Sequence, residues 1–500
     1  MNLSIASLTG IKGMDLPEKA YFDLPEKVIQ FGTGVLLRGL PDYFIDKANK
    51  RGIFNGRIVV VKSTGHNTAS AFDEQQGLFT HCIRGIQGGL KVEEDLINAS
   101  ISRVLSARTQ WREILNCAAS PSIQVIISNT TEVGITLTPD DLQADPPVSF
   151  PGKLLAFLVE RYRIFGQVPG KGLVIVPTEL IPDNADRLKS ILLELCRLHG
   201  LADGFMDWLE RENYFCNSLV DRIVPGKLPA KDQQDMEIKY DYSDELMIMS
   251  EPYALWAIES GHQRVKEVLC FWQADPGVII APDIYRYRQL KLRLLNGSHT
   301  FSCGLAVLCG FSTVKQAMED PRFRGYISAL LLQEIVPSIT GDMVSSQEAE
   351  AFALQVIDRF SNPFIEHQWL SITMQYSSKM ATRNVPVLLA HMERYGRTPA
   401  FMTMGFAAHL LFMRGEKAPD NSYHGVIAGK KYLINDDNAA YYSDCWQNKD
   451  LPGMVREICG NEALWKTNLA SLPEFAEEVT RYLQIILEQG AYAAILHILN

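Results

Sequence analysis

The stretch Lys27–Gly34, Lys-Val-Ile-Gln-Phe-Gly-Thr-Gly, decides the expected fold, because a short apolar run ends there in two closely spaced glycines. Residues 35–50 follow with apolar side chains at helical spacing, so the segment predicts a strand, a glycine turn and a helix. Such a turn lets a pyrophosphate approach the backbone. Leu37 stands where the third glycine of the dinucleotide pattern would be, so the turn alone also fits a purely structural bend.

Three further apolar runs rich in β-branched residues follow at 57–62, 123–128 and 172–177. They show little alternation, which is typical of parallel strands that are covered on both faces. Helical patterns at 110–119 and 153–162 precede the last two runs. Strands alternating with helices predict an α/β fold, a Rossmann-type doubly wound sheet, in the N-terminal half. Segments 78–84 and 101–105 are expected to be additional strands.

The second half of the chain has a different pattern, because the β-branched runs stop after about residue 285. Long amphipathic stretches predict a mainly α-helical C-terminal domain, over 285–309, 346–360, 367–394, 401–414 and 473–499. Turn residues at Pro276-Gly277 and Pro282 place the boundary nearby. We therefore predict a dinucleotide-binding domain over 1–280 and a helical substrate and catalytic domain over 281–500.

The composition favours a small-molecule partner. The 500 residues carry a formal net charge of −10, which disfavours nucleic acid and anionic membrane surfaces as partners. The nine cysteines are scattered, without a Cys-x-x-Cys pair or a metal-ligand spacing, so we expect reduced thiols, no metal and a cytoplasmic location. The first twenty residues and the apolar tail at 475–499 are both interrupted by charges, so neither predicts a signal peptide or a membrane anchor. Oligomeric partners stay open.

The segment Arg286–Thr300 contains the residues that best suit catalysis. At about 100° per helical residue, Lys291, Asn296 and His299 fall within an arc of roughly 140° on one face. Carbonyl reduction needs a proton donor, an amide that polarises the oxygen and a group that orients the substrate. A lysine is a useful acid only where burial or a cationic neighbour lowers its usual pKa of ~10.4. The alternative is a solvated basic helix with a capping Asn and a core His.

Several motifs together carry a resemblance to a known family. They are Gln30–Gly34 with Leu37-Arg38, Ser128–Gly134, Leu219–Val224, Lys291-x4-Asn296-x2-His299 and Arg359–Pro363. With these motifs the chain resembles the mannitol dehydrogenase family of long-chain polyol and sugar-acid oxidoreductases. The similarity runs, with gaps, from about Lys27 to about Gly490. Within the family it is most similar to the members that reduce tagaturonate to altronate in hexuronate catabolism.

The resemblance implies a zinc-free, NAD(H)-dependent enzyme whose active site lies between a Rossmann-type and a helical domain. It implies that Lys291 is the general acid and base, that Asn296 polarises the carbonyl and that His299 orients the substrate. Asp221 would line the substrate cleft, and Glu132 would lie on the proton path, although a structural carboxylate is an equal alternative for Glu132. The residues expected to bind the cofactor are Phe31, Gly32, Thr33, Gly34, Val35, Leu36, Lys62, Asn129 and Thr130.

A sugar acid needs a cation for its carboxylate. The resemblance places the candidates in a stretch that matches the family's substrate-domain helices. These predicted substrate-binding residues are Arg359, Asn362, His367, Lys379 and Arg383. For any single cation among them, a surface or interhelical salt bridge is the competing interpretation.

Two departures from the family pattern bear on specificity. Leu180 stands where polyol-oxidising members carry an Asn, and the Glu179-Leu180 pair is similar to the uronate branch, which favours a sugar acid over mannitol. The second strand ends in Lys62-Ser63-Thr64 and no acid follows before Asp73, so NADP is not excluded as the cofactor.

Three alternatives to tagaturonate reduction stay open. A fructuronate, mannonate or mannitol-type oxidoreductase would share the chemistry. A regulatory protein would bind the nucleotide without catalysis. A metal-dependent dehydrogenase is disfavoured by the lack of ligand spacing. The sequence predicts no role for residues 415–449.

Overall fold

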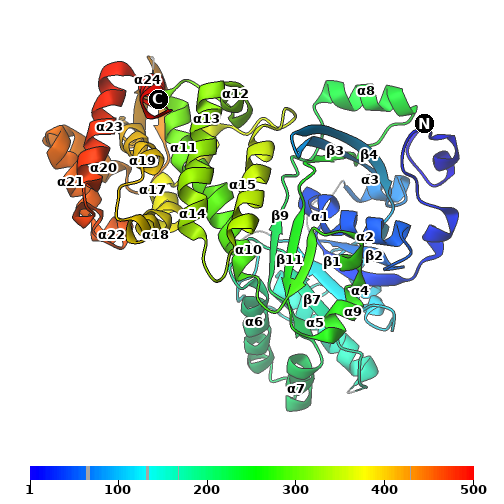
Figure 1. The fold of residues 1–500 in the computed structure, drawn as a ribbon. Helices are drawn as coiled ribbons and strands as arrows, with labels where there is room; N and C mark the ends of the chain where they lie inside the picture. The colour runs from blue at the N-terminus through cyan, green and yellow to red at the C-terminus, as the bar shows by residue number, and fades with distance from the viewer. Residues whose placement is uncertain (64–67, 131–133, 167, 428, 500) are drawn as a thin grey trace. The chain divides into compact units, whose positions relative to one another are not determined.

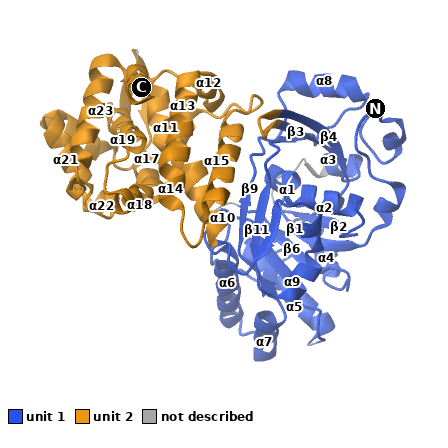
Figure 2. Ribbon diagram, in the orientation of Figure 1, with its two compact units in different colours: residues 1–84, 91–284 blue, residues 85–90, 285–500 orange. Residues whose placement is uncertain are grey.

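The protein is described by a computed structural model that covers the chain except residues 64–67, 131–133, 167, 428 and 500. It divides into two compact units (Figure 2). Unit 1 comprises Met1–Arg84 and Lys91–Ile284, and unit 2 comprises Gly85–Leu90 and Tyr285–Asn500.

Unit 1 is built around a six-stranded parallel sheet with the order β5-β2-β1-β6-β7-β8. Figure 1 labels β1, β2 and β7 of this sheet. The strands are β1 Glu26–Phe31, β2 Arg57–Lys62, β5 Ile101–Ser106, β6 Val125–Ser128, β7 Val174–Pro177 and β8 Tyr214–Phe215. Counted along the chain, these sheet strands follow the Rossmann order 3-2-1-4-5-6. The strand order reverses between β1 and β6, which is where open α/β sheets bind their ligands.

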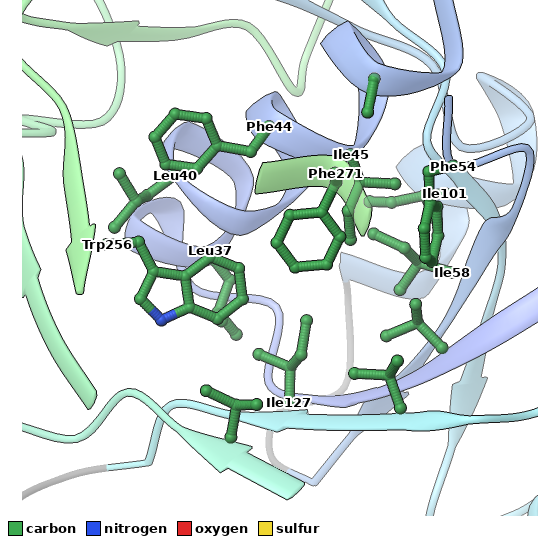
Figure 3. Close-up of a cluster of buried hydrophobic side chains, with 14 of the residues drawn as sticks. Leu37, Leu40, Phe44, Ile45, Phe54, Ile58, Ile101, Ile127, Trp256 and Phe271 are labelled. Carbon is green, nitrogen blue, oxygen red and sulfur yellow. The ribbon is translucent and has the colours of Figure 1, made fainter. Parts of the chain in front are cut away.

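Both faces of this sheet are buried, which explains the nearly continuous apolar runs in its strands. Ile58 and Val60 of β2 pack into a core with α1 Val35–Gly39 and α2 Pro41–Lys50 (Figure 3). Val59 and Val61 enter the opposite core. That core also contains residues of α4 Trp111–Cys117, α5 Phe150–Phe165, α6 Asn184–Leu198 and α7 Asp203–Arg211.

The predicted doubly wound α/β domain is confirmed, and one of the two additional segments belongs to its sheet. Segment 101–105 is the edge strand β5, paired with β2, whereas segment 78–84 lies in β3 Phe79–Gln87 of a separate sheet. The smaller sheets have the orders β10-β3-β4 and β12-β11-β9. Their other strands are β4 Leu90–Asn98, β9 Ser218–Asp221, β10 Ile248–Ser250, β11 Leu255–Glu259 and β12 Val278–Ala281. The remaining helices are α3 Thr68–Glu74, α8 Ala230–Tyr240 and α9 Gln263–Val268.

Unit 2 is mainly helical, as the amphipathic patterns predict, and contains one small antiparallel sheet. The sheet consists of β13 Glu416–Lys417, β14 Tyr423–Ile427 and β15 Lys430–Ile434, so it occupies part of the segment that had no predicted role. The helices are α10 Tyr285–Gln289, α11 Gly297–Leu308, α12 Val314–Glu319, α13 Pro321–Ala329, α14 Val336–Ile339, α15 Ser346–Phe360, α16 Trp369–Ile372, α17 Tyr376–Lys379, α18 Val385–Tyr395, α19 Ala400–Phe412, α20 Ala439–Asn448, α21 Leu451–Gly460, α22 Glu462–Trp465, α23 Phe475–Gln489 and α24 Ala491–Leu499. None of the helices in the described part of the chain is both long and apolar enough to cross a membrane.

Three π-helical segments interrupt these helices, and the amphipathic patterns do not predict them. They are η4 Leu290–Asn296, η5 Leu330–Ile335 and η6 Met380–Asn384. The last two run directly into Val336-Pro337 and Val385-Pro386. Proline lacks the N–H that an α-helix needs in its interior, so the regular hydrogen-bond ladder cannot continue there.

The buried carboxyl of Asp42, on α2, makes the stability of unit 1 depend on pH. Burial raises its pKa from 3.8 to about 8, although Gln30 and Arg38 oppose the shift. The folded state therefore keeps a proton that the unfolded state loses, and stability should fall as the pH rises from about 4 to about 8, by at most about 1.4 kcal/mol per pH unit. We expect Asp42→Asn to flatten this slope in urea unfolding. An unchanged slope would show that Asp42 is ionised in the folded protein.

Candidate functional site

The glycine turn after β1 has the backbone geometry that the sequence predicts. Gly32 has a φ of +130°, and its amide donates to the Val61 carbonyl at 3.0 Å. A Cβ at Gly32 would lie 2.9 Å from Leu37 Cδ1 and 3.0 Å from the Asn129 carbonyl oxygen. Leu37 thus packs against the turn from the position of the missing third glycine. A Cβ at Gly34 would meet nothing within 4 Å, so the backbone at Gly34 borders open space.

Substitutions at these two glycines should therefore have different effects. Gly32→Ala should lower the melting temperature of the free protein, because a positive φ and two close contacts together cost about 1–3 kcal/mol. Gly34→Ala should leave the melting temperature unchanged and weaken NADH binding, because the new methyl group occupies the space that a pyrophosphate needs. Thermal melts and NADH titrations of both variants test this. The expectation would be contradicted if both variants lowered the melting temperature equally, or if Gly34→Ala bound NADH as tightly as the wild type.

The ends of β6 and β7 form a hydrogen-bonded cluster next to the turn. Glu179 accepts hydrogen bonds from the Thr130 amide at 2.8 Å, the Thr130 hydroxyl at 3.0 Å and the Ser128 hydroxyl at 3.1 Å. Asn129 Nδ2 donates to the Thr178 carbonyl and hydroxyl oxygens at 3.1 and 3.0 Å. Glu179 is buried, and burial raises its pKa. Thr178 and Glu179 therefore hold the loop after β6 in place, a role that sequence reasoning missed because the two strands are far apart in the chain.

The other predicted cofactor residues differ in accessibility. The Phe31 ring is buried edge-on against Phe150, with ring centroids 5.2 Å apart, so only its backbone borders the turn. Lys62 is buried at the end of β2. Thr33, Val35 and Leu36 are partly exposed. Glu132 and Thr64 lie outside the described residues.

The predicted catalytic residues of unit 2 lie on and directly after a π-helix. Lys291 and Asn296 belong to η4, and His299 lies in the first turn of α11. Hydrogen bonds in a π-helix run from residue i to i+5, so residues five apart lie one turn above each other. Lys291 and Asn296 therefore share a face more closely than the α-helical arc of about 140° indicates. Asp221 lies in unit 1, buried at the end of β9.

His299 is enclosed by aromatic rings and cations. Its ring stacks on Phe360, with centroids 3.9 Å apart and an interplanar angle of 11°, and it meets the rings of His367 and Trp369 edge-on. Burial lowers the pKa of His299 well below its usual range, and the positive charges of His367, Arg359 and Arg383 lower it further. The imidazole is therefore neutral at pH 7. Among the described residues its buried Nε2 has no hydrogen-bond partner.

Lys379 and Arg383 form a cationic pair near His299. Lys379 Nζ donates to the Ile372 carbonyl at 3.0 Å, and Arg383 donates to the Thr300 hydroxyl at 3.2 Å. Burial lowers the pKa of each, and the charge of Arg383 adds to the shift at Lys379. Within the described part of the chain, neither side chain forms an ion pair with a carboxylate. This result opposes the salt-bridge interpretation and leaves two positive charges for an anionic ligand.

The two remaining predicted substrate residues are buried in the same unit. Arg359 is the penultimate residue of α15, and its charge contributes to the electrostatics of His299. Asn362 accepts a hydrogen bond from the Phe364 amide at 2.9 Å, which is typical of a turn residue. Among the residues that the structure describes, no group of three or more His, Cys, Asp or Glu side chains could hold a metal ion.

Comparison with known proteins identifies two family models, one that matches the N-terminal part of the chain and one that matches the C-terminal part. The family model described as "Mannitol dehydrogenase Rossmann domain" matches residues 26–268, and "Mannitol dehydrogenase C-terminal domain" matches residues 283–487. Two curated relatives are named altronate oxidoreductase. The protein from Halalkalibacterium halodurans is 36% identical over 95% of this chain and 94% of its own length, and the one from Bacillus subtilis is 35% identical over 95% of each.

Two solved structures share the fold over their full length. Mannitol 2-dehydrogenase of Pseudomonas fluorescens, in a ternary complex with NAD and D-mannitol, aligns with a TM-score of 0.70 at 23% identity and covers 100% of this chain and 99% of its own. A substrate-free D-sorbitol dehydrogenase aligns with a TM-score of 0.80 at 19% identity, covering 99% of this chain and 100% of its own. On the family models and the full-length relatives, the chain belongs to the mannitol dehydrogenase family.

Proposed function

We propose that the protein is an NAD(H)-dependent oxidoreductase that reduces the keto group of tagaturonate to altronate and catalyses the reverse oxidation. The observation that carries the proposal is the pair of cations Lys379 and Arg383, for which the described residues provide no carboxylate partner and of which Arg383 acts on the buried His299. A polyol has no anionic group for such a pair, whereas a sugar acid has one. The altronate oxidoreductases that are 35–36% identical to this chain support the same substrate.

We assign the cofactor to the first domain, residues 1–280, and the substrate to the second, residues 281–500. The open backbone at Gly34 and the reversal of strand order between β1 and β6 suit a dinucleotide. The bound cofactor supplies the hydride for the keto carbon. Asn129 and Thr130, held by Thr178 and Glu179, border the same edge of the sheet. NAD is the proposed cofactor, and the buried Lys62 at the end of β2 leaves NADP as an outcome to test.

In the proposed mechanism, Lys291 donates a proton to the oxygen of the substrate carbonyl as that oxygen gains negative charge. The amide of Asn296 donates a hydrogen bond to the same oxygen and polarises it. His299, neutral because burial lowers its pKa, hydrogen-bonds a substrate oxygen through its unpartnered Nε2. Lys379 and Arg383 bind the carboxylate and so fix the orientation of the keto carbon. The nine free cysteines suit a reducing, cytoplasmic location.

A substrate panel tests the proposal. Purified protein is mixed with NADH or NADPH, and cofactor oxidation is followed by absorbance with tagaturonate, fructuronate, fructose and tagatose. We expect the highest kcat/KM with tagaturonate and NADH. A preference for fructuronate would reassign the substrate within the sugar acids, and a preference for fructose would refute the role of the cationic pair. Binding of NADH without oxidation of any substrate would indicate a regulatory protein.

A further inference from the structure

Three of the residues proposed to act on substrate belong to two neighbouring π-helical segments. Lys291 and Asn296 lie in η4, and Arg383 lies in η6. A π-helix is rare and lacks the regular α-helical hydrogen-bond ladder. The orientation of its side chains therefore depends on contacts from outside the helix. Among the described residues, four side-chain hydrogen bonds join η6 to η4 and to the adjoining α11.

The first two of these hydrogen bonds come from Arg293 of η4. In an α-helical ladder the Thr382 carbonyl would accept from the amide of residue 386, but that residue is Pro386 and has no N–H. Arg293 donates instead to the Thr382 and Arg383 carbonyls, each at 2.7 Å. Its Nε donates to Gln289 at 3.1 Å, which orients the guanidinium. Arg293 thus bonds two carbonyls at the end of η6, close to the step where Pro386 supplies no N–H.

The third hydrogen bond runs in the opposite direction. Asn384, at the end of η6, donates from Nδ2 to the Gly297 carbonyl at 3.2 Å. It occupies the N-cap position of α18, where an Asn side chain usually bonds an amide of its own helix, but it makes no such capping bond. Asn384 is buried, so its side chain is shielded from solvent where it contacts α11.

The hydrogen bonds of Arg293 and Asn384 lie on either side of Arg383, the residue that we assign to the substrate carboxylate. Arg383 donates to the Thr300 hydroxyl at 3.2 Å, and this hydroxyl donates to the Asn296 carbonyl at 2.7 Å. A shift of η6 would therefore move the guanidinium of Arg383 relative to Asn296. Misplacement by about 1 Å is enough to impair a reaction that depends on positioning.

Building on the proposed function, we propose that Arg293 and Asn384 are positioning residues. They form a reciprocal clamp that joins η6 to η4 and to the adjoining α11, and this clamp fixes the carboxylate-binding Arg383 relative to the carbonyl-binding Asn296. The clamp thereby sets the distance between the carboxylate and the keto carbon of an accepted substrate.

A double-mutant cycle tests the clamp. Arg293→Ala should raise the KM for tagaturonate about ten-fold and leave the KM for NADH unchanged, because the clamp acts on the substrate site alone. If Arg293 acts through Arg383, the double variant with Arg383→Ala should be no worse than Arg383→Ala alone. Arg293→Lys, which can reach only one of the two carbonyls, should give an intermediate KM. Asn384→Leu, which removes the donor at similar volume, should resemble Arg293→Ala.

Arg394→Ala is the matched control. Arg394 also donates to a backbone carbonyl at a Val-Pro step, that of Pro337, and to the Thr340 hydroxyl at 2.9 Å, but among the described residues it forms no hydrogen bond with η4 or η6. Its loss should leave the KM for tagaturonate unchanged. The clamp would be overturned if the KM effects of Arg293→Ala and Arg383→Ala multiply in the double variant, or if Arg394→Ala raises the KM for tagaturonate as much as Arg293→Ala does.

If Arg293→Ala fails to fold, Arg293→Lys and Asn384→Leu provide the same test. A wild-type protein that does not reduce tagaturonate would refute the proposed function itself, and the clamp with it.

Discussion

Replacing Lys291 with Ala is expected to lower the kcat for tagaturonate reduction by about 10²- to 10⁴-fold while NADH still binds. General acid catalysis contributes a factor of this size, and the variant has no amine to donate the proton. The KM for NADH should not change, because the glycine turn and the loop after β6 lie in unit 1, whereas Lys291 lies in unit 2. Stopped-flow measurement of NADH oxidation under single-turnover conditions separates this chemical step from binding.

Two further variants make this result interpretable. Lys291→Met keeps most of the side-chain volume, so its melting temperature shows whether the loss of rate comes from the amine or from packing. Lys315→Ala removes a lysine of α12 elsewhere in unit 2 and should keep full activity. A Lys291→Ala enzyme that turns over at more than about a tenth of the wild-type rate would remove Lys291 from the mechanism.

Replacing Arg383 with Ala is expected to raise the KM for tagaturonate by about 10- to 100-fold. A hydrogen bond to a charged group contributes about 1.5–3 kcal/mol, and each 1.4 kcal/mol corresponds to a factor of ten. Lys379 remains in this variant and keeps part of the attraction for the carboxylate. Steady-state kinetics with tagaturonate and NADH varied separately measure the effect, and the KM for NADH should be unchanged.

Arg383→Lys distinguishes charge from geometry at the same position. It keeps the positive charge but loses the two-pronged contact of a guanidinium with a carboxylate, so its KM should lie between those of wild type and Arg383→Ala. A KM for tagaturonate that is the same in all three proteins would show that the carboxylate binds elsewhere.

The fold of unit 1 could be predicted well from local patterns, because β2, β6 and β7 of its main sheet are β-branched runs whose residues are all buried. Residues 57–62 form β2, and the glycine turn follows β1 as expected. Segment 78–84 could not be assigned to its sheet, since its partner β10 lies more than 150 residues further along the chain. A separation of 49 residues likewise concealed the cluster of Glu179 with Thr130.

The sequence could not predict the local geometry of the helices that carry the candidate site residues. The amphipathic stretch 285–309 predicted one continuous α-helix, whereas the structure has α10, the π-helix η4 and α11 in succession. Likewise 367–394 is divided into α16, α17, η6 and α18. Pro386 and Pro337 were the available signals, since each interrupts an amphipathic pattern and each follows a π-helix. The clamp of Arg293 and Asn384 gives no such signal, because it joins side chains to backbone carbonyls about ninety residues away in the sequence.

Transfer of a label from the cofactor to the product tests the central claim most directly. The protein is incubated with tagaturonate and NADH that carries deuterium at both C4 positions, and the product is analysed by mass spectrometry and NMR. We predict altronate with one deuterium on the former keto carbon, in an amount equal to the NADH consumed. NADH that stays bound and unoxidised, or altronate without deuterium, would contradict the account.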